Sequence, residues 1–184
     1  MSSSCISSGG NDKYGSPIPG PVRACEGAAA MALAIAKVEP ECYIHGFAGG
    51  NYSGYYHSGS SNVSGFVDLG ITPKMRLDAA LKHTVNQNFG STDCAIPALY
   101  AYKNGLKVDA IVIITDNETW VGNIHPSQAL QQYREKMGIP VKQVIIGMTS
   151  TGFTVTDPDD ALSLDVVGFS ADAPSVIQQF VGSM

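Results

Sequence analysis

Long apolar runs alternate with amphipathic stretches through the second half of the chain. One continuous run, DAIVIITD, covers residues 109–116, and another, VKQVIIGM, covers residues 141–148. Such runs are typical of strands buried on both faces in a parallel sheet. Between them, residues 125–138 place apolar side chains at helical spacing and end on a glycine, which predicts an amphipathic helix. The alternation predicts an open, mostly parallel, doubly wound α/β sheet with helices on both faces.

The first half of the chain contains weaker signals. Residues 1–20 are rich in Ser, Gly and Pro, and they predict an irregular segment without a core of its own. The rest of the chain, 21–184, is then one domain. Pro21 fits the first turn of an alanine-rich helix over residues 21–38, in which the small side chains favour close packing against a neighbour.

Further elements follow from shorter patterns. Thr72 is the expected N-cap of its helix, and Pro73 is expected at the first helical position. The remaining predicted strands are 41–48, 63–69 as an edge strand, and 164–169; the remaining helices are 72–87, 95–105 and 173–181.

Composition narrows the classes of function. The 184 residues are 44% hydrophobic, enough for one sizeable core, and the net charge of −5 with only 11 Lys and Arg argues against a surface built for nucleic acid. The chain has no apolar run of about 18 residues, so we expect no membrane partner. The four cysteines have no zinc-site spacing and favour reduced thiols in a cytoplasmic protein.

Two loop positions carry oxygen atoms suited to a hard cation. Asp116 directly follows the apolar run at 109–115, and Thr92 precedes the predicted helix at 95–105. In open α/β sheets, ligands bind beyond the carboxyl ends of the strands. Hydroxyl and carboxylate oxygens suit Mg²⁺ or Mn²⁺ rather than zinc. The residues alone leave an alternative open, because Thr and Asp at helix starts also serve as caps.

Several segments together resemble a known family. They are GSTDC, ITDNETW, HPSQALQQYREKMGIPVKQVIIGMTSTGFTVTDPDD and LDVVGF. These segments are similar to the C-terminal von Willebrand factor A domain of the Ro ribonucleoprotein (TROVE-module) family of RNA-binding autoantigens and their bacterial and phage relatives. The similarity is dense over residues 90–184 and loose over 21–48.

This resemblance implies a von Willebrand factor A (Rossmann-like) fold with a metal-ion-dependent adhesion site. Three loops build such a site: an Asp-x-Ser-x-Ser motif, a Thr that matches Thr92, and an Asp that matches Asp116. The cation would be Mg²⁺ or Mn²⁺, with one coordination position left for water or for a carboxylate of an acidic protein ligand. Glu118 is placed to act on the cation through water.

The chain departs from this family pattern in one respect. It contains no Asp-x-Ser-x-Ser motif, and Ser2 and Ser4 are the remaining candidate hydroxyl ligands of the first loop. The family's first strand is central, between the strands predicted at 42–48 and 109–115, so we expect that strand to be missing or replaced. A second chain could supply it, the reading frame could be truncated, or another segment such as 65–71 could fill its place.

Three functions remain in view. The first is a binding module of a Ro-type RNA-binding protein, carrying part of a divalent-metal site within a non-coding-RNA ribonucleoprotein. The resemblance implies that RNA contacts the helical-repeat ring of the full-length family, rather than these residues. The second is an assembly or structural role through open strand edges. The third is a metal-assisted hydrolase, which the lack of a Gly-rich phosphate loop disfavours, so we expect no enzyme.

Overall fold

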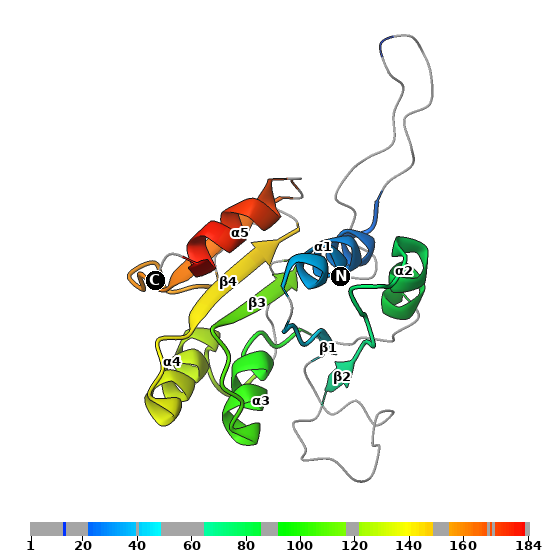
Figure 1. The fold of residues 1–184 in the computed structure, drawn as a ribbon. Coiled ribbons are helices and arrows are strands. Elements are labelled where there is room, and N and C mark those ends of the chain that lie inside the picture. The colour runs from blue at the N-terminus through cyan, green and yellow to red at the C-terminus, as the bar shows by residue number, and fades with distance from the viewer. Residues whose placement is uncertain are drawn as a thin grey trace.

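The computed structural model describes residue 13 and residues 22–39, 41–48, 65–85, 92–116, 122–148, 155–168, 170 and 172–182. In these ranges, a parallel sheet lies between two helical layers, with a small antiparallel pair of strands and one further helix beside it (Figure 1). No helix in the described ranges is long and apolar enough to cross a bilayer.

The parallel sheet contains three strands in the order β3–β4–β5. They span Ala110–Thr115, Lys142–Gly147 and Ser163–Val167, and both neighbouring pairs are parallel. All six residues of β4 are buried, as expected of a strand with neighbours on both sides. The predicted strands at 109–116, 141–148 and 164–169 are therefore confirmed.

Helices α3 (Ile96–Asn104) and α4 (Pro126–Met137) cover one face of the sheet. Their shared core with β3 and β4 is centred on fully buried residues such as Tyr133, Leu130 and Ile145. The Tyr133 hydroxyl donates to the Leu106 carbonyl and accepts the Val108 N–H at 3.3 Å, so this buried polar atom is paired. These bonds tie α4 to the segment that leads into β3.

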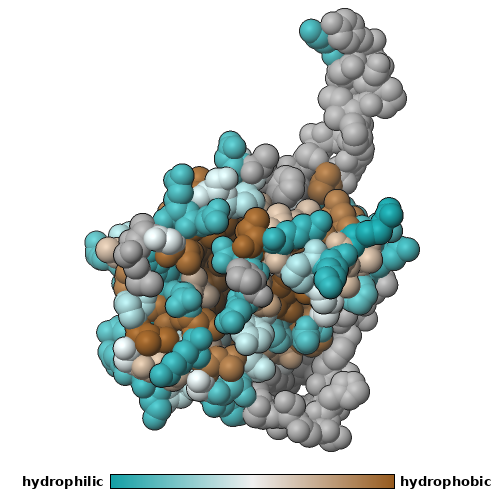
Figure 2. All heavy atoms as spheres, in the orientation of Figure 1, coloured by the Kyte–Doolittle hydropathy of each residue, from teal (hydrophilic) through white to brown (hydrophobic). Residues whose placement is uncertain are grey.

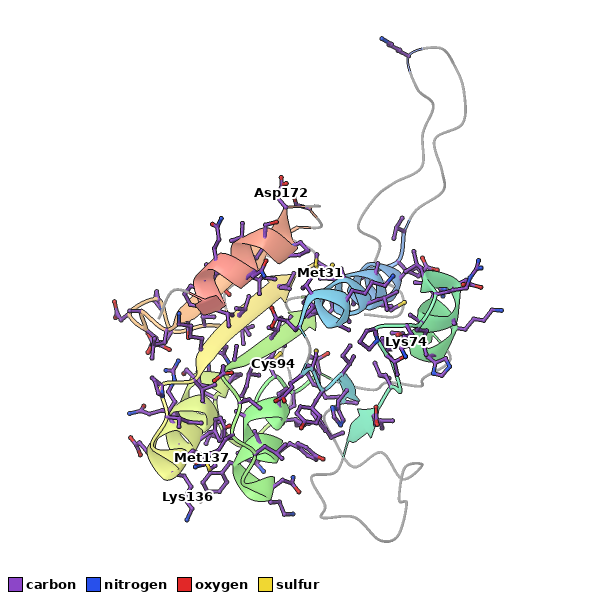
Figure 3. The ribbon with its side chains drawn as sticks, in the orientation of Figure 1. Met31, Lys74, Cys94, Lys136, Met137 and Asp172 are labelled. Atoms are coloured by element: carbon purple, nitrogen blue, oxygen red, sulfur yellow. The ribbon has the colours of Figure 1, made fainter. Side chains whose placement is uncertain are left out.

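Helices α1 (Ala24–Val38) and α5 (Ala173–Gly182) lie on the opposite face. A second apolar cluster joins them to the sheet through Met31, Val144, Ile146 and Ile177. Figure 3 labels Met31 on α1 on this side of the sheet and Cys94 on the other side, between the sheet and α3. The two helical layers confirm the doubly wound arrangement.

A separate two-stranded pair lies beside the parallel sheet. Strand β1 (His45–Phe47) pairs antiparallel with β2 (Phe66–Asp68), so the expected edge strand is confirmed. Because 65–71 continues from this pairing into a cluster with α1 and α2 (Leu77–Val85), it does not take a place beside β3. Within the described ranges, β1 and β3 belong to different sheets.

Two predicted helix starts are wrong. The helix predicted to begin at Thr72 begins at Leu77, because Thr72 accepts a hydrogen bond from the Met75 N–H at 2.9 Å and residues 72–75 form a turn. Pro73 fits the second position of such a turn as well as it fits a helix start. Helix α1 begins at Ala24 rather than Pro21, with the Glu26 carboxylate accepting the Arg23 backbone N–H at 3.0 Å.

Candidate functional site

The candidate site begins at the carboxyl end of β3. Thr115 is the last residue of the strand and is 1% exposed, and Asp116 follows it at 8% exposed. The Thr115 hydroxyl lies 3.4 Å from an Asp116 carboxylate oxygen, a long hydrogen bond. A carboxylate this well buried is costly to desolvate unless charge or hydrogen bonds compensate it. Asp116 therefore has the burial expected of a structural or cation-binding group.

Thr92 and Asp93 form the second part of the site, in the segment before α3. The Asp93 carboxylate accepts the Ala95 N–H at 2.9 Å, so it holds one of the backbone donors at this helix start. Burial raises the pKa of the Asp93 carboxyl, and the bond from Ala95 opposes that rise. Thr92 is half-buried and lines the same cavity as Thr115.

Close packing brings the two loops together. Gly122, in the loop after β3, lies against the Asp93 carboxylate, and a Cβ atom at Gly122 would be 2.9 Å from the nearer carboxylate oxygen. Its φ of +147° is also a conformation that favours glycine. Gly122, in the chain after β3, is thus in contact with the segment before α3. The contact made by Gly122 was not predicted from the sequence. The only sequence signal for it is a glycine that follows the end of a strand.

The oxygen donors fit part of a cation site. Thr92 and Asp116 supply the hard oxygen chemistry that Mg²⁺ and Mn²⁺ prefer. Among the described residues, no group of three or more His, Cys, Asp or Glu side chains could hold a metal ion. The other predicted ligands, Ser2, Ser4 and Glu118, lie outside the described residues. Of the predicted ligands, the structure describes Thr92 and Asp116, and their part in metal binding stays a prediction.

Other residues considered in the sequence occupy structural positions. His45 lies in β1, and the Nδ1 atom of His125 accepts the Ser127 N–H at 3.3 Å at the start of α4. Cys94 is fully buried in the core. One feature was not expected: the rings of His45, Phe66 and Tyr100 form a cluster, in which Phe66 stacks on His45 at 4.5 Å and on Tyr100 at 4.2 Å, and this cluster joins the β1–β2 pair to α3.

Fold and site together define a class of protein, an α/β domain with a von Willebrand factor A-like fold and loops gathered at the carboxyl end of its parallel strands. The family model described as the Ro60 vWA domain matches residues 12–181. The chain belongs to this family.

Similar proteins agree with this assignment. An RNA-binding protein RO60 from Deinococcus radiodurans is 42% identical over 153 residues, covering 83% of this chain and 26% of the relative. The RNA-binding protein RO60 of Caenorhabditis elegans is 37% identical over 115 residues, covering 62% of this chain and 18% of the relative. The crystal structure of the D. radiodurans RO (RSR) protein has a TM-score of 0.74 and 38% identity, covering 95% of this chain and 31% of that one. The chain therefore spans about a quarter of the D. radiodurans relative's length.

Proposed function

We propose that this domain is a ligand-binding module of a Ro-type RNA-binding protein. Its candidate site would hold Mg²⁺ or Mn²⁺ through Thr92 and Asp116, directly or through water. The observation that supports this proposal is the contact of Gly122, in the chain after β3, with Asp93, the neighbour of Thr92 in sequence. Open α/β sheets bind ligands at this end of their strands.

The bound cation would supply a positive charge that attracts a carboxylate from an acidic partner. Asp116 would hold the cation near the buried end of β3, and Thr92 would orient it from the start of α3. With two loops contributing, binding by these residues alone is expected to be weak, because each lost oxygen ligand must be replaced by water. The role is one of binding rather than turnover.

RNA binding is proposed for the longer protein of which such a domain is part. The relatives are named RNA-binding proteins, and this chain matches about a quarter or less of their length. The net charge of −5 makes a phosphate-binding surface on this domain unfavourable. We therefore place the RNA contacts outside these residues, and we expect this domain alone to leave the mobility of a structured small RNA unchanged in a gel-shift assay.

Calorimetric titration of the 184-residue chain with MgCl₂ and MnCl₂ tests the metal proposal. Asp116→Asn removes the charge but keeps the shape, and it should abolish the binding heat. Asp109→Asn, at the exposed opposite end of the same strand, is the matched control and should leave the binding heat unchanged. Thr92→Val should weaken binding without changing the fold.

A longer variant of this chain, extended at its N-terminus by an apolar strand and an Asp-x-Ser-x-Ser loop, makes this test more specific. It should bind the cation more tightly than the 184-residue chain, and Asp116→Asn should abolish that binding too. If neither chain binds Mg²⁺ or Mn²⁺, the metal proposal is wrong.

A further inference from the structure

Helix α3 ends on an asparagine–glycine pair. Asn104 is the last residue of the helix, and Gly105 follows it with a φ of +61°. Of the eight asparagines in the chain, Asn104 alone is followed by glycine. In such a pair, the backbone nitrogen of the second residue can attack the side-chain amide carbon of the first, and a glycine has no side chain to hinder it. The pair is therefore a candidate site of covalent change.

Water can reach this end of the helix. Gly105 is exposed and Asn104 is half-buried. A Cβ atom built on Gly105 would have no atom within 4 Å beyond its chain neighbours, so the space beside the pair is open. Helix α3 lies at the margin of the view in Figure 1, and in the same view Figure 2 shows hydrophobic atoms gathered at the hollowed centre with hydrophilic atoms around them. The pair thus has both an unhindered nucleophile and access to solvent.

The reaction of such a pair is a deamidation, and water is its only co-reactant. A bond forms between the Gly105 nitrogen and Asn104 Cγ, and the bond from Cγ to Nδ2 breaks. The Gly105 amide proton leaves with the Nδ2 group as ammonia, and a cyclic imide remains. Water then adds to one of the two imide carbonyls and opens the ring. The product is aspartate or isoaspartate, and in isoaspartate the main chain runs through Cγ.

The folded helix restrains both reacting groups. The Gly105 N–H donates to the Ala101 and Tyr102 carbonyls, to the latter at 3.2 Å. The Asn104 Nδ2 group donates to the Tyr100 carbonyl at 2.9 Å. Attack requires the Gly105 nitrogen to give up its bonds and Asn104 to leave its helical conformation. The reaction therefore starts only when the last turn of α3 opens, and helix ends undergo such local openings.

The Tyr133 hydroxyl limits this opening from the other side. It donates to the Leu106 carbonyl and accepts the Val108 N–H at 3.3 Å, so the segment after the pair is held to α4. Tyr133 is 0% exposed, and its buried ring fixes the position of the hydroxyl. The Leu106 N–H in turn donates to the Ala101 carbonyl at 3.0 Å. Opening is therefore confined to the turn that contains the asparagine–glycine pair.

We propose that the Asn104–Gly105 pair is a site of spontaneous deamidation, gated by opening of the last turn of α3. The product keeps that turn open. A carboxylate at position 104 has no Nδ2 hydrogen for the Tyr100 carbonyl, and it places negative charge at the negative end of the helix dipole. Isoaspartate also lengthens the main chain, so the Gly105 and Leu106 N–H groups cannot both recover their bonds. Because ammonia is lost, each molecule is changed once and irreversibly, and α3 is then joined less firmly to β3.

Peptide mass spectrometry of the whole 184-residue chain tests this proposal. The chain is incubated at mildly alkaline pH, folded in buffer and unfolded in urea, and conversion is read from the mass gained when OH replaces NH₂. Asn123 is the internal control, because it is exposed but is followed by Ile124, whose branched side chain hinders the attack. In both states Asn104 should convert and Asn123 should not. The folded chain should react at least about tenfold more slowly than the unfolded chain, because the last turn of α3 is mostly closed.

Two tyrosine variants test the gate. Tyr133→Phe removes the hydroxyl that holds Leu106 and Val108, and it should speed up the conversion of Asn104 in the folded chain about three- to tenfold, since lost hydrogen bonds ease the opening. Tyr102→Phe removes a hydroxyl from an exposed side chain of α3, and it should leave the rate unchanged. In urea both variants should react as fast as the unaltered chain. Circular dichroism checks that both keep the fold.

The product is identified in the aged, folded chain. An isoaspartyl methyltransferase with a labelled methyl donor should label the peptide that contains residue 104, and Asn104→Gln should remove this label because the longer side chain closes a ring far more slowly. Residue-resolved amide exchange should be faster at Gly105 and Leu106 in the aged chain than in the fresh chain. The proposal is overturned if Asn104 converts no faster than Asn123, or if folding does not slow its conversion. Equal rates in the two folded tyrosine variants would also overturn the gate.

Discussion

Backbone hydrogen bonds hold together both the β3–β4–β5 sheet and the β1–β2 pair, but the packing around the two differs. Strand β4 is hydrogen-bonded on both sides and has six buried residues, and helices cover both faces of its sheet. Strand β1 has three residues and one described neighbour, and the ring cluster of His45, Phe66 and Tyr100 joins it to α3. Isolated two-stranded pairs are marginal in water, so the packing around a ladder decides its stability more than the ladder does. We expect the β1–β2 pair to open first.

A Val→Ala substitution in each region should give the largest difference in stability between the two regions. Val144 in β4 is 0% exposed, and Val144→Ala should lower the free energy of unfolding by about 2–3 kcal/mol, since it removes buried methyl groups and leaves a cavity. Val67 in β2 is half-buried, and Val67→Ala should cost under about 1 kcal/mol. Urea denaturation measures both values, and equal costs would contradict the comparison.

Substitution of one glycine should disrupt the β1–β2 pair locally. A Cβ at Gly65 would lie 2.0 Å from the Ala48 carbonyl oxygen, and Gly65 has a φ of +95°. Gly65→Ala should open the β1–β2 ladder at a global cost of about 1–2 kcal/mol, because a short pair holds little free energy of its own. Amide exchange should speed up at residues 45–47 and 66–68 while that of β4 changes little.

Gly105→Ala is the control for this backbone effect. Gly105 also has a positive φ, of +61°, but no atom lies within 4 Å of its added Cβ. It should cost about 1 kcal/mol through backbone strain alone and leave the β1–β2 exchange rates unchanged. Similar exchange patterns in the two variants would mean that the contact with Ala48 has no special importance.

A fall in pH should destabilise the β1–β2 pair before the parallel sheet, and this is the smallest of the expected effects. Burial lowers the pKa of the His45 imidazole, although the nearby Asp68 charge partly offsets this, so the folded state favours the neutral ring. The stability that this provides is fully present above the unfolded pKa of about 6.5 and is lost as pH falls through the folded value. Amide protection of β1–β2 should therefore fall as pH drops below about 6.5, and His45→Phe should remove this dependence while keeping the ring stack.

The parallel sheet should withstand this range of pH. Burial favours the neutral form of Asp160, but hydrogen bonds from Ser163 and from Arg134, the latter at 2.7 Å, outweigh it and lower the pKa of this carboxyl. Its contribution is present above the unfolded pKa of about 3.9 and is lost only at lower pH. If protection of β4 fell together with that of β1–β2 near pH 6, the two regions would not be independent.

Local patterns were enough to predict most elements, and the misses occurred where local signals were ambiguous. The apolar runs at 109–116 and 141–148 have a single good solution as buried parallel strands, and Gly105 and Gly138 end α3 and α4 as expected. Thr72 and Pro73 suited both a helix cap and a turn, and only the Met75-to-Thr72 hydrogen bond decided between them.

The sequence by itself determined the order of strands and helices, the family, and two oxygen-bearing residues at loop positions, because each depends on short-range spacing or on matching motifs. Only the tertiary structure decided that Gly122 packs on Asp93, that the rings of His45, Phe66 and Tyr100 cluster, and that a groove separates β1 from β3. These contacts join residues far apart in the chain, and their geometry depends on how the helical layers pack on the sheet. The spacing of residues along the chain does not predict such distances.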